Sequence, residues 1–205
     1  IVAALLMYAQ DNDDKSVVSV HDLDADDTVD HLYPWFQPLY GYVKDKNVFY
    51  DPVVTQNPDV LPNLITLDIW KQNRTDYLIN GFFAHGESFS IVSKPAEQIL
   101  ISERHARLAF FDYHPWPSAP DDNWERGILD GSGYVMENPQ TGVQLLDPKN
   151  IGRHTGGNNY SFVDGHAKWF KFTATLNKDL PADDVLNYGM HNVDNLPAPD
   201  HEHVH

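Results

Sequence analysis

The chain has 205 residues, of which 41% are hydrophobic and 12% aromatic, a composition typical of a folded protein with one substantial core. Thirty acidic and 14 basic residues give a formal charge of −16. A field of that sign repels phosphate groups, which argues against nucleic acid and anionic membrane surfaces as partners. No cysteine is present, so disulfides, zinc–thiolate sites and thiol catalysis are excluded.

The chain opens with an apolar run from Ile1 to Ala9. Val2, Leu5, Leu6 and Ala9 recur with the helical period, which predicts a helix that ends at the polar run DNDD. The apolar run is shorter than the ~20 residues of a membrane span. It also lacks the basic region and the cleavage site of a signal peptide. We therefore interpret it as the end of a longer helix that begins upstream of Ile1.

An acidic loop follows the predicted helix. Its spacing resembles positions 1, 3, 5 and 9 of a calcium-binding EF-hand loop, although Asp27 replaces the usual glycine and Tyr33 the usual bidentate glutamate. The spacing predicts a weak calcium site, and a solvated acidic loop is the alternative. The candidate ligands are Asp22, Asp24, Asp26 and Asp30.

The middle of the chain alternates short apolar runs with turn residues. The patterns predict a short aromatic helix around Pro34 and Pro38, strands near 77–79 and 99–101, a strand or turn near 48–50, and a loop at 81–87. Residues 112–127 are rich in Pro, Asp and Trp, which predicts a surface loop. The tryptophans of this loop, Trp116 and Trp124, either fill the core or an interface or form stacking platforms for sugar rings.

The segment from Tyr160 to Phe172 gives the strongest hairpin signal. Asp164-Gly165 is a favoured pair for a two-residue type I′ turn. Such a turn would pair Tyr160 with Trp169 and leave one apolar face on the strand pair. That face would carry Tyr160, Phe162, Ala167 and Trp169.

The stretch RHTGGNNYSFVDGHAKW places nine residues between His154 and Asp164. It resembles the His–nine residues–Asp-Gly signature of the prepilin-type, pilin-like proteins of Planctomycetes and related bacteria. The segments ALLMYAQDND, WFQPLYGYVKDKNVFYDP, YLINGFF and SKPAEQILISE resemble that family in the same order, so the resemblance covers most of the chain up to about Phe172. Two features depart from it. The family's membrane-spanning Phe-Thr-Leu-Ile-Glu helix is absent, and Asp51 stands where many members carry a cysteine.

The resemblance implies an α+β, pilin-like fold, in which the end of a long N-terminal α-helix packs on an antiparallel β-sheet head with long loops. Residues 1–15 would form the helix end, 16–180 the head and 181–205 an extended tail. The helix would first anchor the subunit in the inner membrane and then pack in the core of a filament. The implied assembly residues are Ile1, Val2, Leu5 and Leu6, and the implied structural motif is His154, Gly156, Gly157, Asp164, Gly165 and Trp169.

Two interpretations of His154 stay open. It could form a general-base pair with Asp164, although Asp164 is needed at its turn and no Ser or Cys stands in a nucleophile elbow. Alternatively, His154 hydrogen-bonds the Gly156-Gly157 loop or the hairpin backbone. No HExxH, Walker A or GxGxxG pattern is present, and we expect no enzymatic activity.

Other histidines are candidate metal ligands. Three alternate in the tail, where an extended chain would place them on one side, while a disordered tail is the alternative. Three more residues are candidate ligands, but their spacing in the sequence does not show whether they lie close together. The tail residues are His201, His203 and His205, and the others are His21, Asp112 and His114.

The sequence thus predicts a structural subunit of a type IV pilus-like or type II secretion pseudopilus-like filament at the cell surface or in the periplasm. Its partners would be copies of itself and other pilin-like subunits. A secreted glycan- or calcium-binding module is the alternative, followed by a metal-dependent hydrolase. Calcium is the cofactor that the acidic loop indicates.

Overall fold

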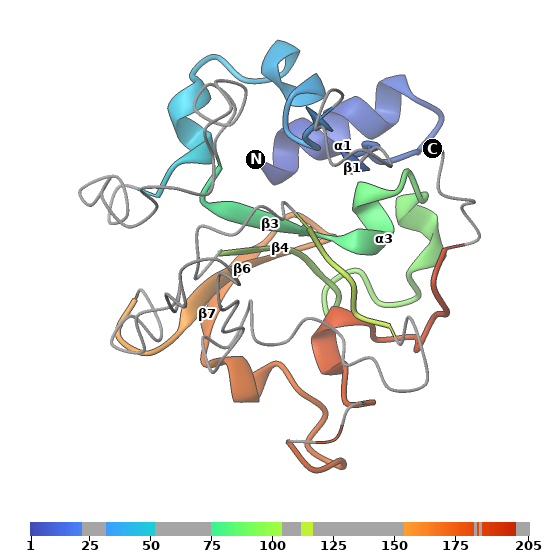
Figure 1. The fold of residues 1–205 in the computed structure, drawn as a ribbon, viewed down its shortest axis with the longest axis vertical. Helices are drawn as coiled ribbons and strands as arrows, with labels where there is room; N and C mark the ends of the chain where they lie inside the picture. Colours follow the sequence, from blue (N-terminus) through green and yellow to red (C-terminus); the bar gives the residue numbers. More distant parts are fainter. Residues whose placement is uncertain are drawn as a thin grey trace, which may run out of the picture.

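The computed structural model describes residues 1–21, 32–51, 75–103, 112–116, 154–182, 184 and 186–199. At its centre is a five-stranded sheet in the order β5-β3-β4-β6-β7 (Figure 1). Neighbouring strands are antiparallel, except that β5 pairs in parallel with β3. The α+β class and a mostly antiparallel sheet are as expected. The strands are β3 (Tyr77–Asn80), β4 (Ile99–Glu103), β5 (Asp112–Tyr113), β6 (Asn158–Phe162) and β7 (Ala167–Phe170).

Helix α1 (Val2–Asp11) lies over one face of the sheet, here called the upper face (Figure 1). Val2, Leu5 and Ala9 follow the helical period and are buried. The helix ends at the polar run, where the Asn12 side chain donates a hydrogen bond to the Tyr8 carbonyl at 2.7 Å. It has ten residues, so the longer helix upstream stays a prediction. Within the described ranges, no helix has the length and apolarity to cross a membrane.

The upper face carries most of the apolar core. Trp35, Phe36 and Phe49 are fully buried, with ring centroids 5.6–6.1 Å apart. Aromatic pairs at such distances add to the free energy of burial. The elements on this side include α3 (Gly81–Ala84), the 3-10 helices η1 (Pro38–Gly41), η2 (Lys46–Phe49) and η4 (Phe89–Ile91), and the short pair β1 (Val20–His21) and β2 (Leu32–Tyr33).

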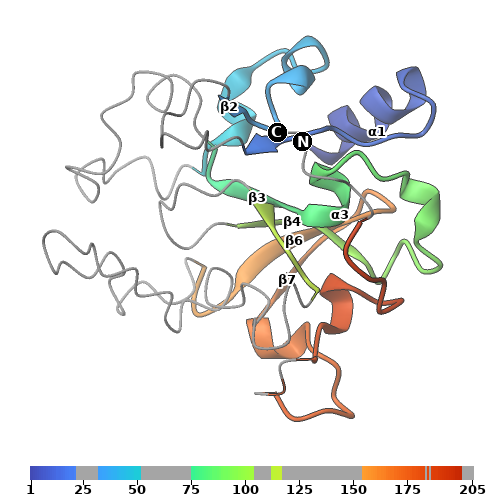
Figure 2. The same cartoon turned by 45° about the vertical axis from the view of Figure 1, so that its right-hand side comes forward.

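The lower face is covered by the C-terminal part of the chain, seen below the sheet in Figures 1 and 2. This part includes η6 (Phe172–Ala174) and η7 (Gly189–His191). Asn187, His191 and Asn192 are buried there. The packing differs from the extended tail predicted from residue 181, because these side chains hydrogen-bond to the backbone of neighbouring segments.

Three local predictions differ from the structure. Residues near 48–50, predicted as a strand or turn, lie at the end of the 3-10 helix η2: Val48 and Phe49 belong to it and Tyr50 follows it, while the Asp45 side chain caps its first turn. The predicted loop at 81–87 begins with α3, because the Asn80 side chain accepts a hydrogen bond from the Phe82 N–H. The segment predicted as a surface loop contains strand β5, and its Tyr113 is fully buried.

The hairpin turns at Asp164-Gly165, where the sequence places it, but its loop is longer than predicted. Gly165 has a φ of +96°, whereas Asp164 has no positive φ, so the type I′ turn is wrong. The Gly165 N–H donates to the Phe162 carbonyl at 2.9 Å, and the Phe162 N–H donates to the His166 carbonyl at 2.9 Å. The loop therefore runs from Val163 to Gly165 and ends in a left-handed glycine.

The longer loop shifts the strand register by one residue. Tyr160 pairs with Lys168, and Trp169 pairs with Asn159. Because alternate residues point to opposite faces, this shift moves Trp169 away from Tyr160. Tyr160 and Phe162 are buried, whereas Trp169 is 42% exposed. The single apolar face predicted for Tyr160, Phe162, Ala167 and Trp169 is therefore wrong.

Candidate functional site: the signature hairpin and two histidine–carboxylate clusters

The residues of the His–nine residues–Asp-Gly stretch form one structural unit beside strands β6 and β7. The Trp169 indole N–H donates to the His154 carbonyl at 2.9 Å, and the His154 N–H donates to the Gly157 carbonyl at 3.3 Å. A Cβ on Gly157 would lie 2.5 Å from the Trp169 ring and 2.6 Å from the Phe170 carbonyl. Gly157 is thus required by the close approach of the indole, which links both ends of the stretch.

The side chain of His154 reaches two carboxylates rather than the loop. Its Nε2 lies 3.2 Å from Asp51 Oδ2 and 3.1 Å from Glu103 Oε1. Asp51 follows η2 and Glu103 ends β4, and both carboxylates are buried. The His154 cluster, defined as Asp51, Glu103 and His154, therefore ties the start of the hairpin to two other parts of the chain.

The burial of Glu103 affects its ionisation. Burial raises the pKa of the Glu103 carboxyl. The hydrogen bond that Asn159 Nδ2 donates to Glu103 Oε1 at 2.7 Å acts in the opposite direction and lowers this pKa, but the effect of burial is larger. Its second oxygen, Oε2, is buried and has no hydrogen-bond partner among the described residues. The cluster atoms lie within 4.8 Å of one another and could hold a cation. The hydrogen-bond distances from Nε2 to both oxygens fit a structural tie.

His154 and Asp164 do not form the general-base pair that the sequence left open, because each side chain has other partners. Asp164 Oδ1 instead accepts hydrogen bonds from His166, from Nδ1 at 2.6 Å and from the backbone N–H at 3.1 Å. These hydrogen bonds lower the pKa of the Asp164 carboxyl. Asp164 is thus occupied at its turn, while His154 contacts Asp51 and Glu103. The backbone of His154 makes the loop contacts that its structural interpretation predicts.

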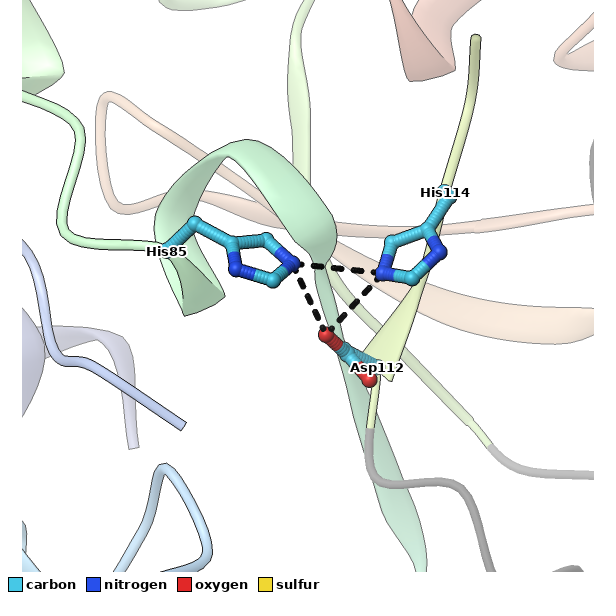
Figure 3. A group of neighbouring side chains, drawn as sticks. All are labelled: His85, Asp112 and His114. Atoms are coloured by element: carbon cyan, nitrogen blue, oxygen red, sulfur yellow. Dashed lines mark hydrogen bonds and ion pairs between the residues drawn. The ribbon is translucent and has the colours of Figure 1, made fainter. Parts of the chain in front are cut away.

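A second cluster joins two of the candidate ligands to a residue that the sequence did not indicate. His85 Nε2, Asp112 Oδ2 and His114 Nε2 converge beside α3 and β5 (Figure 3). The Nε2 atoms of the two histidines are 3.3 Å apart. Asp112 Oδ2 lies 3.7 Å from His85 Nε2 and 3.4 Å from His114 Nε2. We call these three residues the His85 cluster.

The remaining predicted site residues fall into three groups. Trp116 is buried against Phe82, with ring centroids 4.7 Å apart, which fits the core interpretation and not a sugar platform. Val2 and Leu5 are buried in the head, while Ile1 and Leu6 are partly buried. The other predictions lie outside the described residues and stay predictions: Asp22, Asp24, Asp26, Asp30, Trp124, His201, His203 and His205.

Sequence reasoning missed His85, Asp51 and Glu103 as site residues. His85 is separated from His114 by 29 positions, and Asp51 from His154 by 103. None of the three lies in a motif with ligand spacing. The available signal was topological, since a strand at Asp112 beside the end of α3 would have brought His114 toward His85.

No family model, no curated protein and no solved structure matches this chain.

Proposed function

We propose that the chain is a structural subunit of a cell-envelope or extracellular filament of the type IV pilin-like or type II secretion pseudopilin-like kind. Its partners in this proposal are further copies of itself and other pilin-like subunits. A helix that continues upstream from α1 would anchor the subunit in the inner membrane and then assemble in the filament. The proposed location is the cell surface or the periplasm.

The observation that carries this proposal is the two-sided character of α1. One side packs into the head through Val2, Leu5 and Ala9. On the opposite side, Met7 is apolar and 50% exposed, while Leu6 is partly buried against the core. A helix in a filament has to contact its own head on one side and neighbouring subunits on the other, and α1 has residues for both.

The assembly residues need a correction in this light. Val2 and Leu5 are among the assembly residues that the resemblance implies, but both are buried within this chain. Burial of such a side chain contributes roughly 1.5–3 kcal/mol, and here that free energy stabilises the subunit and not the assembly. The contact with neighbours therefore passes in our proposal to Met7, Leu6 and Ile1.

The signature stretch supports a structural role as well. His154 and Trp169 hold the start of the hairpin against its second strand, and the His154 side chain ties it to β4. Such crosslinks stabilise the head of a subunit that has to withstand repeated contacts in a polymer. The hairpin tip also approaches α1, because a Cβ on Gly165 would lie 3.8 Å from Leu6 Cδ1.

The test uses the full-length gene product with everything that precedes Ile1 retained. We expect filaments by electron microscopy. Met7→Glu should reduce filament number strongly while leaving the melting temperature of the head within a few degrees, because Met7 is half exposed. Gln10→Glu is the matched control, since it adds the same charge at an exposed position of the same helix.

Two results would contradict the proposal. The first is a full-length protein that is monomeric in detergent-free buffer after cleavage of a signal peptide. The second is equal filament formation by both variants and by the unmodified protein. Salt gives a further readout. Subunits whose chains carry a formal charge of −16 repel one another, so filament formation should increase between low and physiological ionic strength.

A further inference from the structure

We propose that His85, Asp112 and His114 bind a divalent transition-metal ion, with Zn²⁺ as the ion that best fits their donor atoms and spacing. Their three donor atoms form a triangle with sides of 3.3, 3.4 and 3.7 Å. This site is independent of the filament proposal and shares no residue with the calcium loop predicted from the sequence.

The size of the triangle matches a small ion. The point equidistant from its corners lies about 2.0 Å from each, close to the 2.0–2.2 Å of zinc–imidazole and zinc–carboxylate bonds. The ligand atoms of a tetrahedral zinc ion with such bonds stand about 3.3–3.6 Å apart. Two sides of the triangle fall within this range and the third, 3.7 Å, exceeds it by about 0.1 Å, so the cluster has close to the spacing of three corners of a zinc tetrahedron.

The donor types select the same class of ion. Two imidazole nitrogens with one carboxylate oxygen suit Zn²⁺ and other first-row transition metals, whereas Ca²⁺ and Mg²⁺ prefer oxygen ligands throughout. In the His154 cluster, by contrast, one nitrogen faces two oxygens at 3.1 and 3.2 Å. That arrangement is explained by a hydrogen bond between His154 Nε2 and Asp51 Oδ2, with Glu103 Oε1 also within ion-pair distance of Nε2.

Hydrogen bonds among these three atoms themselves explain their mutual distances less well. One Nε2–H can donate to the other Nε2 at 3.3 Å, but the carboxylate oxygen then lies 3.4 and 3.7 Å from these nitrogens. Those separations exceed the usual 2.7–3.2 Å of N–H···O hydrogen bonds. A cation between the three atoms accounts for all three distances at once.

The ligands are held in place by packing and by the sheet. Alternation along the chain at β5 puts Asp112 and His114 on the same side, with Asp112 opposite Ile79 in the parallel pair. The His85 N–H donates to the Gly81 carbonyl at 3.0 Å, which fixes the residue at the end of α3. A site with ligands fixed in this way loses little conformational freedom when a metal binds.

Aromatic packing orients the third ligand. The His114 ring stacks on Trp116, with centroids 4.8 Å apart and an interplanar angle of 27°. Gly81 makes room for both rings, because a Cβ there would lie 2.7 Å from His114 Cδ2 and 2.5 Å from Trp116. The Trp116 side chain thus sets the direction of the His114 imidazole toward its partners.

The site is open on one side. The Asp112 side chain is 2% exposed, while those of His85 and His114 are 21% and 34% exposed. A metal with three protein ligands keeps a further coordination position for water or another ligand. Solvent can reach this position from the side of the histidines, and the acidic chain as a whole attracts cations.

The test uses the full chain with His201, His203 and His205 changed to Gln, because the tail imidazoles could bind metal themselves. Equilibrium dialysis against Zn²⁺ followed by elemental analysis should find one ion per chain, and Zn²⁺ should raise the melting temperature. His114→Gln in the same background should lose both effects. His166→Gln is the matched control, since His166 is exposed, contacts Asp164 and lies outside the cluster.

A spectroscopic measurement keeps the proposal testable even if His114→Gln folds poorly. Co²⁺ bound at the His85 cluster should give the intense visible absorption of a tetrahedral ion, and added Zn²⁺ should remove it. The proposal is overturned if the background protein binds no Zn²⁺, if Co²⁺ shows only a weak octahedral spectrum, or if a folded His114→Gln variant keeps its full zinc content.

Discussion

The two faces of the sheet are stabilised by different kinds of interaction. Under α1, large apolar side chains such as Trp35, Phe36 and Leu5 fill the space and make non-directional contacts. On the opposite face, a fully buried histidine, His191, is surrounded by hydrogen-bonding groups. Apolar packing tolerates changes that conserve volume, whereas a buried polar network requires every partner to be present.

The network on the lower face can be followed atom by atom. The His191 carbonyl accepts hydrogen bonds from Asn80 Nδ2 and Gln98 Nε2, each at 2.7 Å. Its ring nitrogens face two hydroxyls, Tyr113 at 3.0 Å from Nδ1 and Thr175 at 2.8 Å from Nε2. One residue of the C-terminal segment is thus joined to β3, β5 and the chain before β4.

The hydrogen bonds also fix the tautomer of His191. The Thr175 hydroxyl donates to the Phe172 carbonyl at 2.7 Å, so the hydroxyl oxygen accepts from His191 Nε2–H. Burial raises the pKa of Tyr113 well above its ordinary value, so its phenol stays protonated and donates to Nδ1. With its proton on Nε2, the His191 imidazole therefore donates to Thr175 and accepts from Tyr113, so both ring nitrogens and both hydroxyls have a hydrogen-bond partner.

The largest effect is expected from truncation on the apolar face. Trp35→Ala should lower the free energy of unfolding by about 3–5 kcal/mol, because a fully buried indole leaves a cavity that the core fills incompletely. Urea denaturation measures the change. Trp169→Ala is the control and should cost about 1 kcal/mol, mainly for its hydrogen bond to the His154 carbonyl. Equal losses would show that Trp35 is not central to the core.

Replacements of similar volume should separate the two faces. Asn80→Leu should cost about 2–4 kcal/mol, because it removes one of the two side-chain donors to each of the buried carbonyls of His191 and Ile99 and also removes the cap of α3. On the apolar face, Leu100→Met should cost less than about 1.5 kcal/mol. If chemical denaturation showed the same loss of unfolding free energy for both variants, the distinction between the two faces would be wrong.

A smaller effect is expected at the hairpin turn. Gly165→Val should destabilise the fold by about 1 kcal/mol or more, since a β-branched residue tolerates the positive φ of this position poorly. Gly41→Val is the control, because no atom lies within 4 Å of a Cβ there. Thermal denaturation of both variants measures the difference. An unchanged melting temperature for Gly165→Val would show that the turn does not require glycine.

The smallest effect concerns pH. Hydrogen bonds from the Ser93 side chain and backbone lower the pKa of Asp194, which ties the C-terminal segment to the chain before β4. A carboxyl with a lowered folded-state pKa stabilises the fold above its ordinary pKa of 3.8, and this contribution is lost as the pH falls through the lower value. The melting temperatures of Asp194→Asn and the unmodified protein should therefore converge on acidification. A constant difference from neutral to strongly acidic pH would contradict this assignment.

The sequence predicts the parts of the fold that rest on local patterns. The helical period of Val2, Leu5 and Ala9, the apolar run at Ile99 and the turn at Asp164-Gly165 each lie within a few consecutive residues. The register of the hairpin was wrong because an Asp-Gly pair fits both a two-residue loop and a longer loop that ends in a left-handed glycine. The difference depends on the tertiary environment of the whole strand.

The candidate site rests on non-local contacts, and the sequence predicts little of it. The role of His154 in the hairpin unit could be inferred from its neighbours, but its partners Asp51 and Glu103 could not. His85 and His114 meet because β5 pairs in parallel with β3, and no local pattern indicates that pairing. The polar network has the same origin, since partner atoms come from segments up to 111 residues apart.

The distance along the chain between Asn80 and His191 has a consequence for folding during synthesis. At roughly 5–20 residues per second, the carbonyl that Asn80 requires is made on the order of ten seconds after Asn80 itself. Until then the amides of Asn80 and Gln98 have no His191 carbonyl to donate to. An apolar surface exposed for that time would favour aggregation, whereas the amides of Asn80 and Gln98 can hydrogen-bond to water while the end of the chain is still being made.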